Sequence, residues 1–254
     1  MHTQKHHGDS QSLFTARQFI HHFAPHLKET RFPSVCILSL IPQIGRYVQN
    51  ASFKTAPFIF SHSYYTALSK DPDYVLVYAG LGASVAGISL EVCIELGVEK
   101  FLILGTCGLL NPEIQSGEII IPTQFISEEG VSPHYVRSSE KIHLDDMSVD
   151  ILLRVMNKNK IPAYHGLHWT TSAPFRETGA KVESYRARGC HSVDMELSAL
   201  CAISQFYRKK TGALLIGSDR FTESGWKPPR PSFNVVTKRF SQLLTLCPDM
   251  ISEF

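Results

Sequence analysis

The chain has 254 residues, a formal net charge of +2 at pH 7 and a hydrophobic fraction of 43%. This length suits one large α/β domain as well as two small ones, and the hydrophobic fraction is enough for a sizeable core. The small net charge argues against nucleic acid or an anionic membrane as a partner, and no apolar run is long enough to span a bilayer.

The cysteines and histidines indicate a reduced, cytoplasmic protein without a metal. The six cysteines are scattered and form no CxxC motif, and most of them lie in apolar runs. The histidines show neither HExxH nor Cys/His ligand spacing, so we expect no metal site. The N-terminus is polar and has no apolar core of a signal peptide. We expect residues 1–10 to form a flexible tail and residues 11–254 to fold.

The N-terminal part of the chain predicts helices that alternate with short strands. A helix ending at Leu96 follows the loop Gly80–Ser84, with Gly97 as its C′ residue. This loop does not predict a dinucleotide site, because Val85 stands where GxGxxG needs its third glycine. The other elements expected here are helices over Leu13–Leu27 and Ile44–Val48, and strands over Val35–Leu38, Phe58–Phe60 and Asp73–Tyr78.

The stretch Phe101–Gly117 organises the chain. Its apolar start, Phe101–Leu104, predicts a buried strand that breaks at Gly105–Gly108. Glycines at such a turn let the backbone approach a ligand, and Thr106 adds a hydroxyl donor. The alternative is an ordinary junction between a strand and a turn, because short glycine motifs recur by accident.

Helices and strands continue to alternate over the rest of the chain. The pattern therefore predicts one α/β domain, with no linker to divide it. Pro122 is expected to mark a bulge or an edge in its strand. The expected strands are Glu118–Ile126, Tyr164–Thr171, His191–Asp194 and Ala213–Gly217, and the expected helices are Met147–Met156, Lys181–Arg188, Met195–Phe206 and Phe233–Leu246.

Three polar clusters fall where strands are expected to end, which is where open α/β sheets usually place ligands. They are Thr106–Gly108, Asp194–Glu196 and Asp219. A carboxylate at a helix start, such as Glu196, stays ionised and can accept two hydroxyl hydrogen bonds. Asp194 fits an N-terminal cap as well as a ligand. Asp219 fits either a turn or a general acid whose pKa is raised by burial.

Taken together, the clusters resemble a known family. The segments GTCG, NPEIQSGEIIIPT, EEGVSPHY, TTSAPFRET, VDMELSAL and GSD occur in the order seen in the purine nucleoside and uridine phosphorylases. The chain is most similar to the hexamer-forming branch, and especially to its uridine-phosphorylase-like members, over roughly Asp73–Trp226. The resemblance implies a three-layer α/β/α sandwich around a mixed sheet.

The resemblance also implies roles for single residues. Asp219 matches the acid that protonates a purine at N7, and Glu196 matches the residue that holds the ribose hydroxyls. Thr106 matches the hydroxyl that contacts phosphate. The other substrate-binding candidates are Cys107 and Gly108 in the base pocket, Phe175 stacked on the base, Met195 packed on the sugar, and Asp194 in the same segment as Met195 and Glu196.

The chain departs from the family at the expected phosphate contacts. Ile103 stands where an arginine is usual, and Leu40–Arg46 matches the PGDPxR loop poorly. The pair that reads uracil is not visible, because Gly179 and Lys181 stand near its positions. Asp219 favours a purine over a pyrimidine. The candidates for the missing charge are Arg46 and Arg176, or a residue of a neighbouring copy such as His6, His7 or Arg46.

These observations predict phosphorolysis of a nucleoside to a free base and ribose 1-phosphate. No cofactor is expected, with inorganic phosphate as co-substrate, in a homo-oligomer that is a dimer or a hexamer. The alternatives are a nucleosidase that uses water and a nucleoside-binding protein without catalysis, since fold does not fix function.

Overall fold

The computed structural model describes residues 12–42, 44–47, 53–67, 74–229 and 233–253. Its helices are α1 (Ala16–Phe23), α2 (Ile44–Tyr47), α3 (Ala83–Glu95), α4 (Asp146–Lys158), α5 (Gly179–Ala187), α6 (Leu197–Phe206) and α7 (Phe233–Glu253), with short 3-10 turns at Pro25–Leu27, Ser132–His134 and Pro174–Arg176. Its strands are β1 (Val35–Ser39), β2 (Phe53–Pro57), β3 (Ser63–Ala67), β4 (Tyr74–Tyr78), β5 (Lys100–Leu109), β6 (Ile119–Glu128), β7 (Ala163–Thr171), β8 (Cys190–Asp194), β9 (Lys210–Thr222) and β10 (Gly225–Lys227).

Within the described residues the strands form one mixed, ten-stranded sheet in the order β10-β9-β6-β7-β8-β5-β1-β4-β3-β2. At its centre β1 pairs in parallel with β4 and β5, and every residue of β1 is buried. A parallel strand covered on both faces needs no polar face, which is why Val35–Ser39 is almost entirely apolar.

The sheet also curls back on itself. Strand β9 pairs in parallel with β5 and antiparallel with β6, while β8 joins β5 to β7. These pairings bring the carboxyl-terminal parts of β5, β8 and β9 together at one end of the sheet. This convergence positions the candidate site described below.

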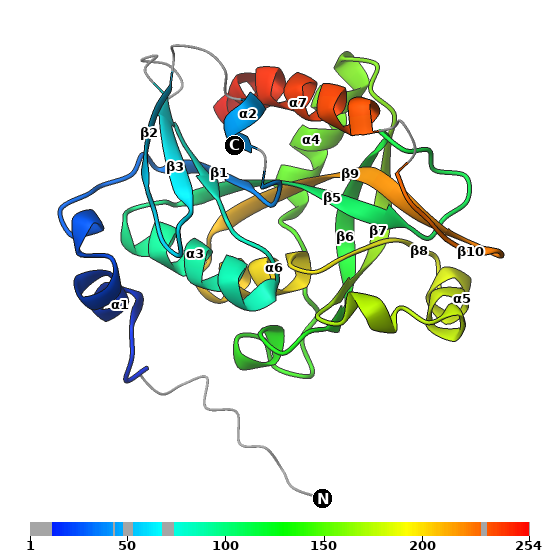
Figure 1. Ribbon diagram of the computed structural model, residues 1–254, viewed down its shortest axis with the longest axis horizontal. Helices are drawn as coiled ribbons and strands as arrows, with labels where there is room; N and C mark the ends of the chain where they lie inside the picture. The colour runs from blue at the N-terminus through cyan, green and yellow to red at the C-terminus, as the bar shows by residue number, and fades with distance from the viewer. Residues whose placement is uncertain (1–11, 43, 48–52, 68–73, 230–232, 254) are drawn as a thin grey trace, which may run out of the picture.

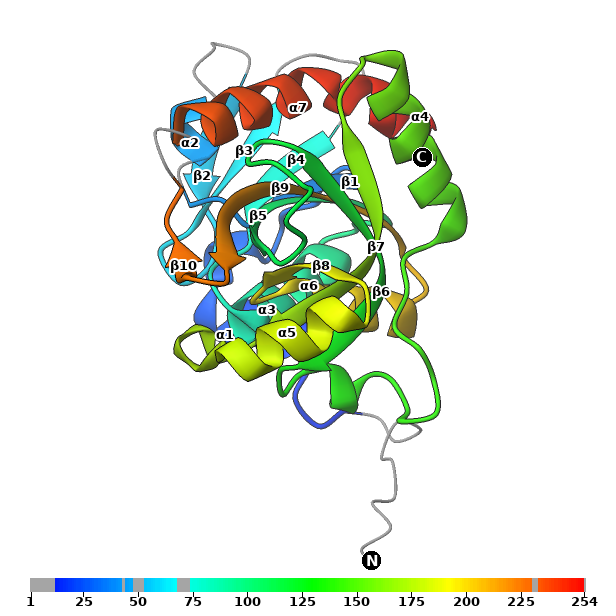
Figure 2. The same ribbon diagram turned by 90° about the vertical axis from the view of Figure 1, so that its right-hand side faces the viewer.

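Helices cover both faces of the sheet (Figures 1 and 2). Helices α3 and α6 lie on one face together with α1 and α5, and α2, α4 and α7 lie on the other. The predicted three-layer α/β/α arrangement around a mixed sheet is therefore confirmed. The prediction of Gly97 as a C′ residue is also confirmed, because its φ of +110° is one that glycine adopts without strain.

The predicted strand over Phe58–Phe60 is wrong. These residues belong to the turn that joins β2 to β3, where Phe60 and Ser61 have left-handed φ values of 48° and 63°. The amide of Phe58 donates to the carbonyl of His62 and closes the turn at 2.7 Å. Phe58 and Ile59 are apolar because the turn itself packs into the core, so hydrophobicity here did not mark a strand.

The predicted break at Gly105–Gly108 is also wrong, because β5 continues as a strand from Lys100 to Leu109, with a shift of its register against β9 between Cys107 and Leu109. A Cβ on Gly105 would lie 2.9 Å from Leu215 and 3.0 Å from Leu40, so this glycine permits close packing instead of a turn. The partner strand β9 likewise continues to Thr222, past the predicted end at Gly217. Asp219 therefore lies inside a strand and not in a turn.

Smaller differences concern the ends of elements. The expected helix Leu13–Leu27 is divided into α1 and a 3-10 turn that begins at Pro25, and α7 extends to Glu253. The bulge expected at Pro122 is confirmed by a shift of register between Pro122 and Gln124. The expected tail 1–10, Val48 and Asp73 lie outside the described residues.

Two structural features are absent from the described residues. No helix among them has both the length and the apolar composition needed to cross a bilayer. No three side chains of His, Cys, Asp or Glu in this part of the chain are grouped as metal ligands would be.

Candidate active site

The eight candidate residues line one cavity of about 560 Å³. Strand β5 contributes Thr106, Cys107 and Gly108, and β9 contributes Asp219. Asp194 ends β8, while Met195 and Glu196 lead from it into α6. The eighth candidate, Phe175, lies in the 3-10 turn Pro174–Arg176. The other lining residues are Leu40, Leu81, Pro174, Glu177, Val193, Ser218, Phe221 and Trp226. The volume falls in the range that holds a small-molecule ligand.

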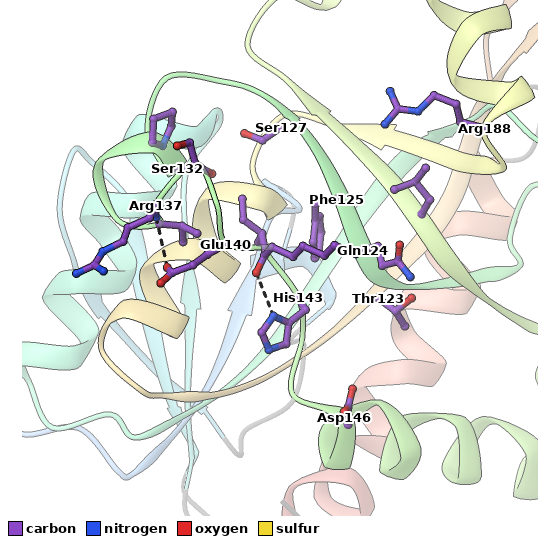
Figure 3. Close-up of a pocket in the computed structure, with 16 residues that line it drawn as sticks. Thr123, Gln124, Phe125, Ser127, Ser132, Arg137, Glu140, His143, Asp146 and Arg188 are labelled. Carbon is purple, nitrogen blue, oxygen red and sulfur yellow. Dashed lines mark hydrogen bonds between the residues drawn. The ribbon is translucent and has the colours of Figure 1, made fainter. Parts of the chain in front are cut away.

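A larger hollow of about 1230 Å³ lies elsewhere and contains none of these eight residues. Figure 3 shows it beside β6, from which Thr123, Gln124, Phe125 and Ser127 are drawn, with Arg188 at the far side. The loop that carries Ser132–Asp146 supplies most of its other lining residues. The sequence candidates therefore single out the smaller cavity.

Glu196 is buried at the start of α6. Its carboxyl group accepts the amide of Gly82 at 2.6 Å through Oε1 and the amide of Met195 at 3.2 Å through Oε2. Burial, and then the charge of Asp194, raise the pKa of Glu196 to about 8, against the opposing effect of the two amides. The expectation that the helix start keeps this group ionised is therefore wrong at neutral pH for the protein without a ligand. A ligand that offers hydroxyl donors or positive charge to this group would favour its ionised form.

The side chain of Asp194 is bonded within the fold and caps the first turn of α6, although the N-cap position is Glu196 and not Asp194 as the capping interpretation predicted. Its Oδ2 accepts the amide of Leu197 at 2.8 Å, in the first turn of α6, and its Oδ1 accepts the hydroxyl of Thr170 at 2.7 Å. Nε2 of the fully buried His168 lies 3.0 Å from the same Oδ1 without the alignment of a hydrogen bond, and Nδ1 lies 2.8 Å from the hydroxyl oxygen of Ser192. Asp194 thus holds the helix start that presents Glu196.

Asp219 has a donor on each oxygen. The hydroxyl of Ser218 donates to Oδ1 at 2.6 Å, and the indole N–H of Trp226 donates to Oδ2, also at 2.6 Å. A Cβ on Gly108 would lie 3.3 Å from Oδ2, so this glycine leaves space for the carboxylate beside β5. The pairing of β10 with β9 brings Trp226 to this place.

The other candidates differ in how they face the cavity. Burial raises the pKa of the Cys107 thiol well above its usual value, which keeps it a neutral group in the wall. Thr106 is partly exposed beside it. Phe175 belongs to the 3-10 turn Pro174–Arg176 at the cavity edge and is 100% exposed. A ring in that position is free to pack on a ligand.

Sequence reasoning missed Glu177 and Trp226. Burial, followed by the charge of Asp219, raises the pKa of Glu177 to about 7. Its carboxyl group makes no hydrogen bond or ion pair with another described residue. Glu177 follows Phe175 in a segment already singled out, so the sequence held a signal for it. The sequence held no such signal for Trp226, because only the pairing of β10 with β9 brings its indole to Asp219.

The lining is acidic. Its ionisable side chains include four carboxyl groups, and no Lys, Arg or His from the described residues joins them. Arg186 is held away by bonds to the carbonyls of Leu110 and Phe221, and Arg176 is exposed. His6, His7 and the side chain of Arg46 lie outside the described part of the structure. A phosphate dianion normally requires a cation as well as amide and hydroxyl donors.

Comparison with known proteins gives consistent relatives. Residues 35–247 match the phosphorylase superfamily. Guanosine phosphorylase of Halorubrum lacusprofundi is 25% identical over 56% of this chain and 59% of its own length. Uridine phosphorylase of Treponema pallidum is 27% identical over 60% of this chain and 63% of its own length. The matched part of the chain thus spans about three fifths of the length of each of these two relatives.

Solved structures share the fold at low identity. Purine nucleoside phosphorylase from Toxoplasma gondii, in complex with immucillin-H, matches with a TM-score of 0.77 at 17% identity, over 89% of this chain and 94% of that one. A 5'-methylthioadenosine/S-adenosyl homocysteine nucleosidase from Campylobacter jejuni matches with a TM-score of 0.75 at 20% identity. The match covers 87% of this chain and 99% of that one. The match over residues 35–247, together with this fold, shows that the chain belongs to the phosphorylase superfamily, an enzyme family that includes the purine nucleoside and uridine phosphorylases.

Proposed function

We propose that the protein cleaves the N-glycosidic bond of a nucleoside, with phosphate as the nucleophile. The observation that carries this proposal is that one cavity is lined by Glu196 at the start of α6 and by two further carboxyl groups, those of Asp219 and Glu177. Relatives named as phosphorylases of guanosine, purine nucleosides and uridine support the reaction class.

The roles follow from the charge that develops during cleavage. Breaking the bond leaves positive charge on the sugar and negative charge on the departing base, as in glycoside hydrolysis. Glu196, in its ionised form, would hold the ribose hydroxyls and offset the positive charge. A carboxyl group near the base would protonate it as it leaves, and the family resemblance assigns this role to Asp219. Phe175 and Met195 would pack on the base and the sugar.

Phosphate would bind near Thr106. The acidic lining requires a cation from outside the described residues, and the candidates are Arg46, His6 or His7, from this chain or a neighbouring copy. A homo-oligomer, dimer or hexamer, is therefore part of the proposal. All six cysteines are buried free thiols, which supports a reducing compartment such as the cytoplasm.

A nucleosidase is the second candidate, and the acidic lining is the observation that favours it. Water needs no cationic cradle, and a nucleosidase shares this fold. An assay of base release from purine and pyrimidine nucleosides, by absorbance or chromatography, tests the common part of both proposals. Release from at least one nucleoside is expected, and no release from any of them, with or without phosphate, would contradict both.

A further inference from the structure

Glu177 lines the cavity with a carboxyl group that no other residue engages. It caps the carboxyl end of the 3-10 turn that carries the exposed ring of Phe175. Its side chain is half-buried, and neither oxygen makes a hydrogen bond or an ion pair with another described residue. Polar groups that lie away from water are normally paired, so this carboxyl group is available to a ligand in the cavity.

The basic side chains nearest to Glu177 in the sequence do not neutralise it. Nζ of Lys181 in α5 is bonded to Glu128 at 2.8 Å, and Arg176 is exposed and does not line the cavity. Among the carboxyl groups of the lining, Asp219 is the one whose charge acts on Glu177. One ligand can therefore contact the carboxyl groups of both Glu177 and Asp219.

Asp219 is able to carry a proton and to donate it. The hydroxyl of Ser218 has two acceptors within reach, Oδ1 of Asp219 at 2.6 Å and the carbonyl of Cys107 at 3.2 Å. When this hydroxyl turns to the carbonyl, Oδ1 is free to hold a proton, while the indole N–H of Trp226 stays on Oδ2 at 2.6 Å. This arrangement fits the acid role toward N7 of a purine that the proposed function gives to Asp219.

A carboxyl group next to Asp219 would face the substituent at C6, which lies beside N7 on the same edge of a purine. Adenine presents an N–H donor there, and a 6-oxopurine presents a carbonyl acceptor. A carboxylate pairs with the amino group and repels the carbonyl oxygen, whereas a protonated carboxyl group can donate to that oxygen. We propose that Glu177 is a specificity-determining residue that reads the C6 substituent and, as a carboxylate, selects 6-aminopurine nucleosides. This role rests on the proposed nucleoside cleavage with Asp219 at N7.

The protonation of Glu177 then sets the preference between the two classes of purine. Burial, followed by the charge of Asp219, raises the pKa of Glu177 to about 7. A 6-oxopurine gains below this pH and a 6-aminopurine above it. The other titratable side chains of the lining are Cys107 from β5, Asp194 from β8 and Glu196 before α6, and none of them contributes to the raised pKa.

The ratio of kcat/KM for adenosine to kcat/KM for inosine, at a fixed phosphate concentration, tests this role. For the unsubstituted enzyme the ratio should rise by about 10-fold from pH 6 to pH 8, as expected for a hydrogen bond to a charged group. Ionisations that affect both substrates equally cancel in the ratio. Glu177→Gln should make the ratio independent of pH, because an amide offers a donor as well as an acceptor and does not titrate.

Purine riboside, with only hydrogen at C6, separates a residue that reads the base from one that only shapes the site. At pH 8 Glu177→Gln should lower kcat/KM for adenosine by about 5-fold or more and that for purine riboside by less than about 2-fold. Glu223→Gln is a matched control, because Glu223 is exposed in the turn between β9 and β10. It should keep the rise of the ratio with pH, and circular dichroism should show that both variants fold.

Several results would overturn the role of Glu177. They are a ratio that does not change with pH in the unsubstituted enzyme, the same rise in Glu177→Gln, and a loss on adenosine that is absent or equal to that on purine riboside. Cleavage of pyrimidine nucleosides alone would also overturn it, and would leave the proposed cleavage intact. Base release from no nucleoside at all would contradict the proposed function itself, so the two failures are distinguishable.

Discussion

Glu196 combines a buried carboxyl group with a role that requires its charge. Replacing it by Gln keeps the shape but removes the charge that would offset the developing sugar cation. We expect Glu196→Gln to lower kcat by about 100-fold or more, as for the loss of a key electrostatic contact. Steady-state rates on any nucleoside that the enzyme cleaves measure this effect. Near-full turnover by the variant would show that Glu196 does not hold the sugar.

The same substitution should affect stability in the opposite direction. The folded-state pKa of about 8 lies above the ordinary value of 4.5, so the folded protein binds more protons than the unfolded chain between these pH values. This buried group therefore costs stability increasingly as pH rises from 4.5 toward 8. We expect Glu196→Gln to raise the Tm by a few degrees, roughly, at pH 8 and to change it little at pH 5. A variant equally stable or less stable at pH 8 would contradict the raised pKa.

Some features of single residues were readable in the sequence and others were not. Thr106, Glu196 and Asp219 stood out because polar side chains after apolar runs mark strand ends, although β5 and β9 proved to run through these positions. Glu177 and Trp226 escaped this reasoning. Their place in the cavity depends on the 3-10 turn Pro174–Arg176 and on the return of β10 along β9, and no local pattern specifies either.

At the scale of elements, the start of α6 depends on Asp194. This carboxylate accepts the amide of Leu197 and the hydroxyl of Thr170, both of them buried. We expect Asp194→Ala to lower the free energy of unfolding by about 2–4 kcal/mol, through loss of a helix cap and of a buried charged acceptor. Urea unfolding measures it. Asp194→Asn keeps one oxygen acceptor and should cost clearly less, and equal costs would show that the capping contact is unimportant.

Strand β10 is the second element with a predicted effect. Trp226 on β10 is 56% exposed, yet its indole N–H is bonded to Asp219. Trp226→Phe keeps an aromatic wall but removes this donor. We expect kcat/KM for a purine nucleoside to fall by about 10-fold, in line with a hydrogen bond to a charged group, with the Tm nearly unchanged. An unaltered kcat/KM would mean that the indole does not serve the site.

The elements that the sequence predicted well are those in which the local sequence pattern and the tertiary packing favour the same structure. Val35–Leu38 is an uninterrupted apolar run in a strand that is buried throughout, and Tyr164–Thr171 forms a strand as predicted. The helix that ends before Gly97 is followed by a glycine where φ is positive. The errors have a common cause. Phe58–Phe60 is an apolar turn and Gly105–Gly108 a glycine-rich strand, and in both cases tertiary packing determined the structure against local preference.

At the scale of the whole molecule, the closure of the sheet explains why residues far apart in sequence meet. Pairing of β9 with β5 brings Asp219 beside Gly108, and pairing of β8 with β5 places Glu196 at the same end. The α/β/α layers could be predicted from the alternation of elements. The curl of the sheet could not, because it depends on long-range pairings that leave no periodic signal in the sequence.

The central question for the whole molecule is whether the nucleophile is phosphate or water. The cavity is acidic, and phosphate needs a cation that the described residues do not bring to the lining. The most direct measurement is the sugar product formed from inosine in matched buffers with and without phosphate. Phosphorolysis predicts that base release requires phosphate and yields ribose 1-phosphate in equal amount. Equal rates without phosphate, with free ribose as the sole sugar product, would contradict it.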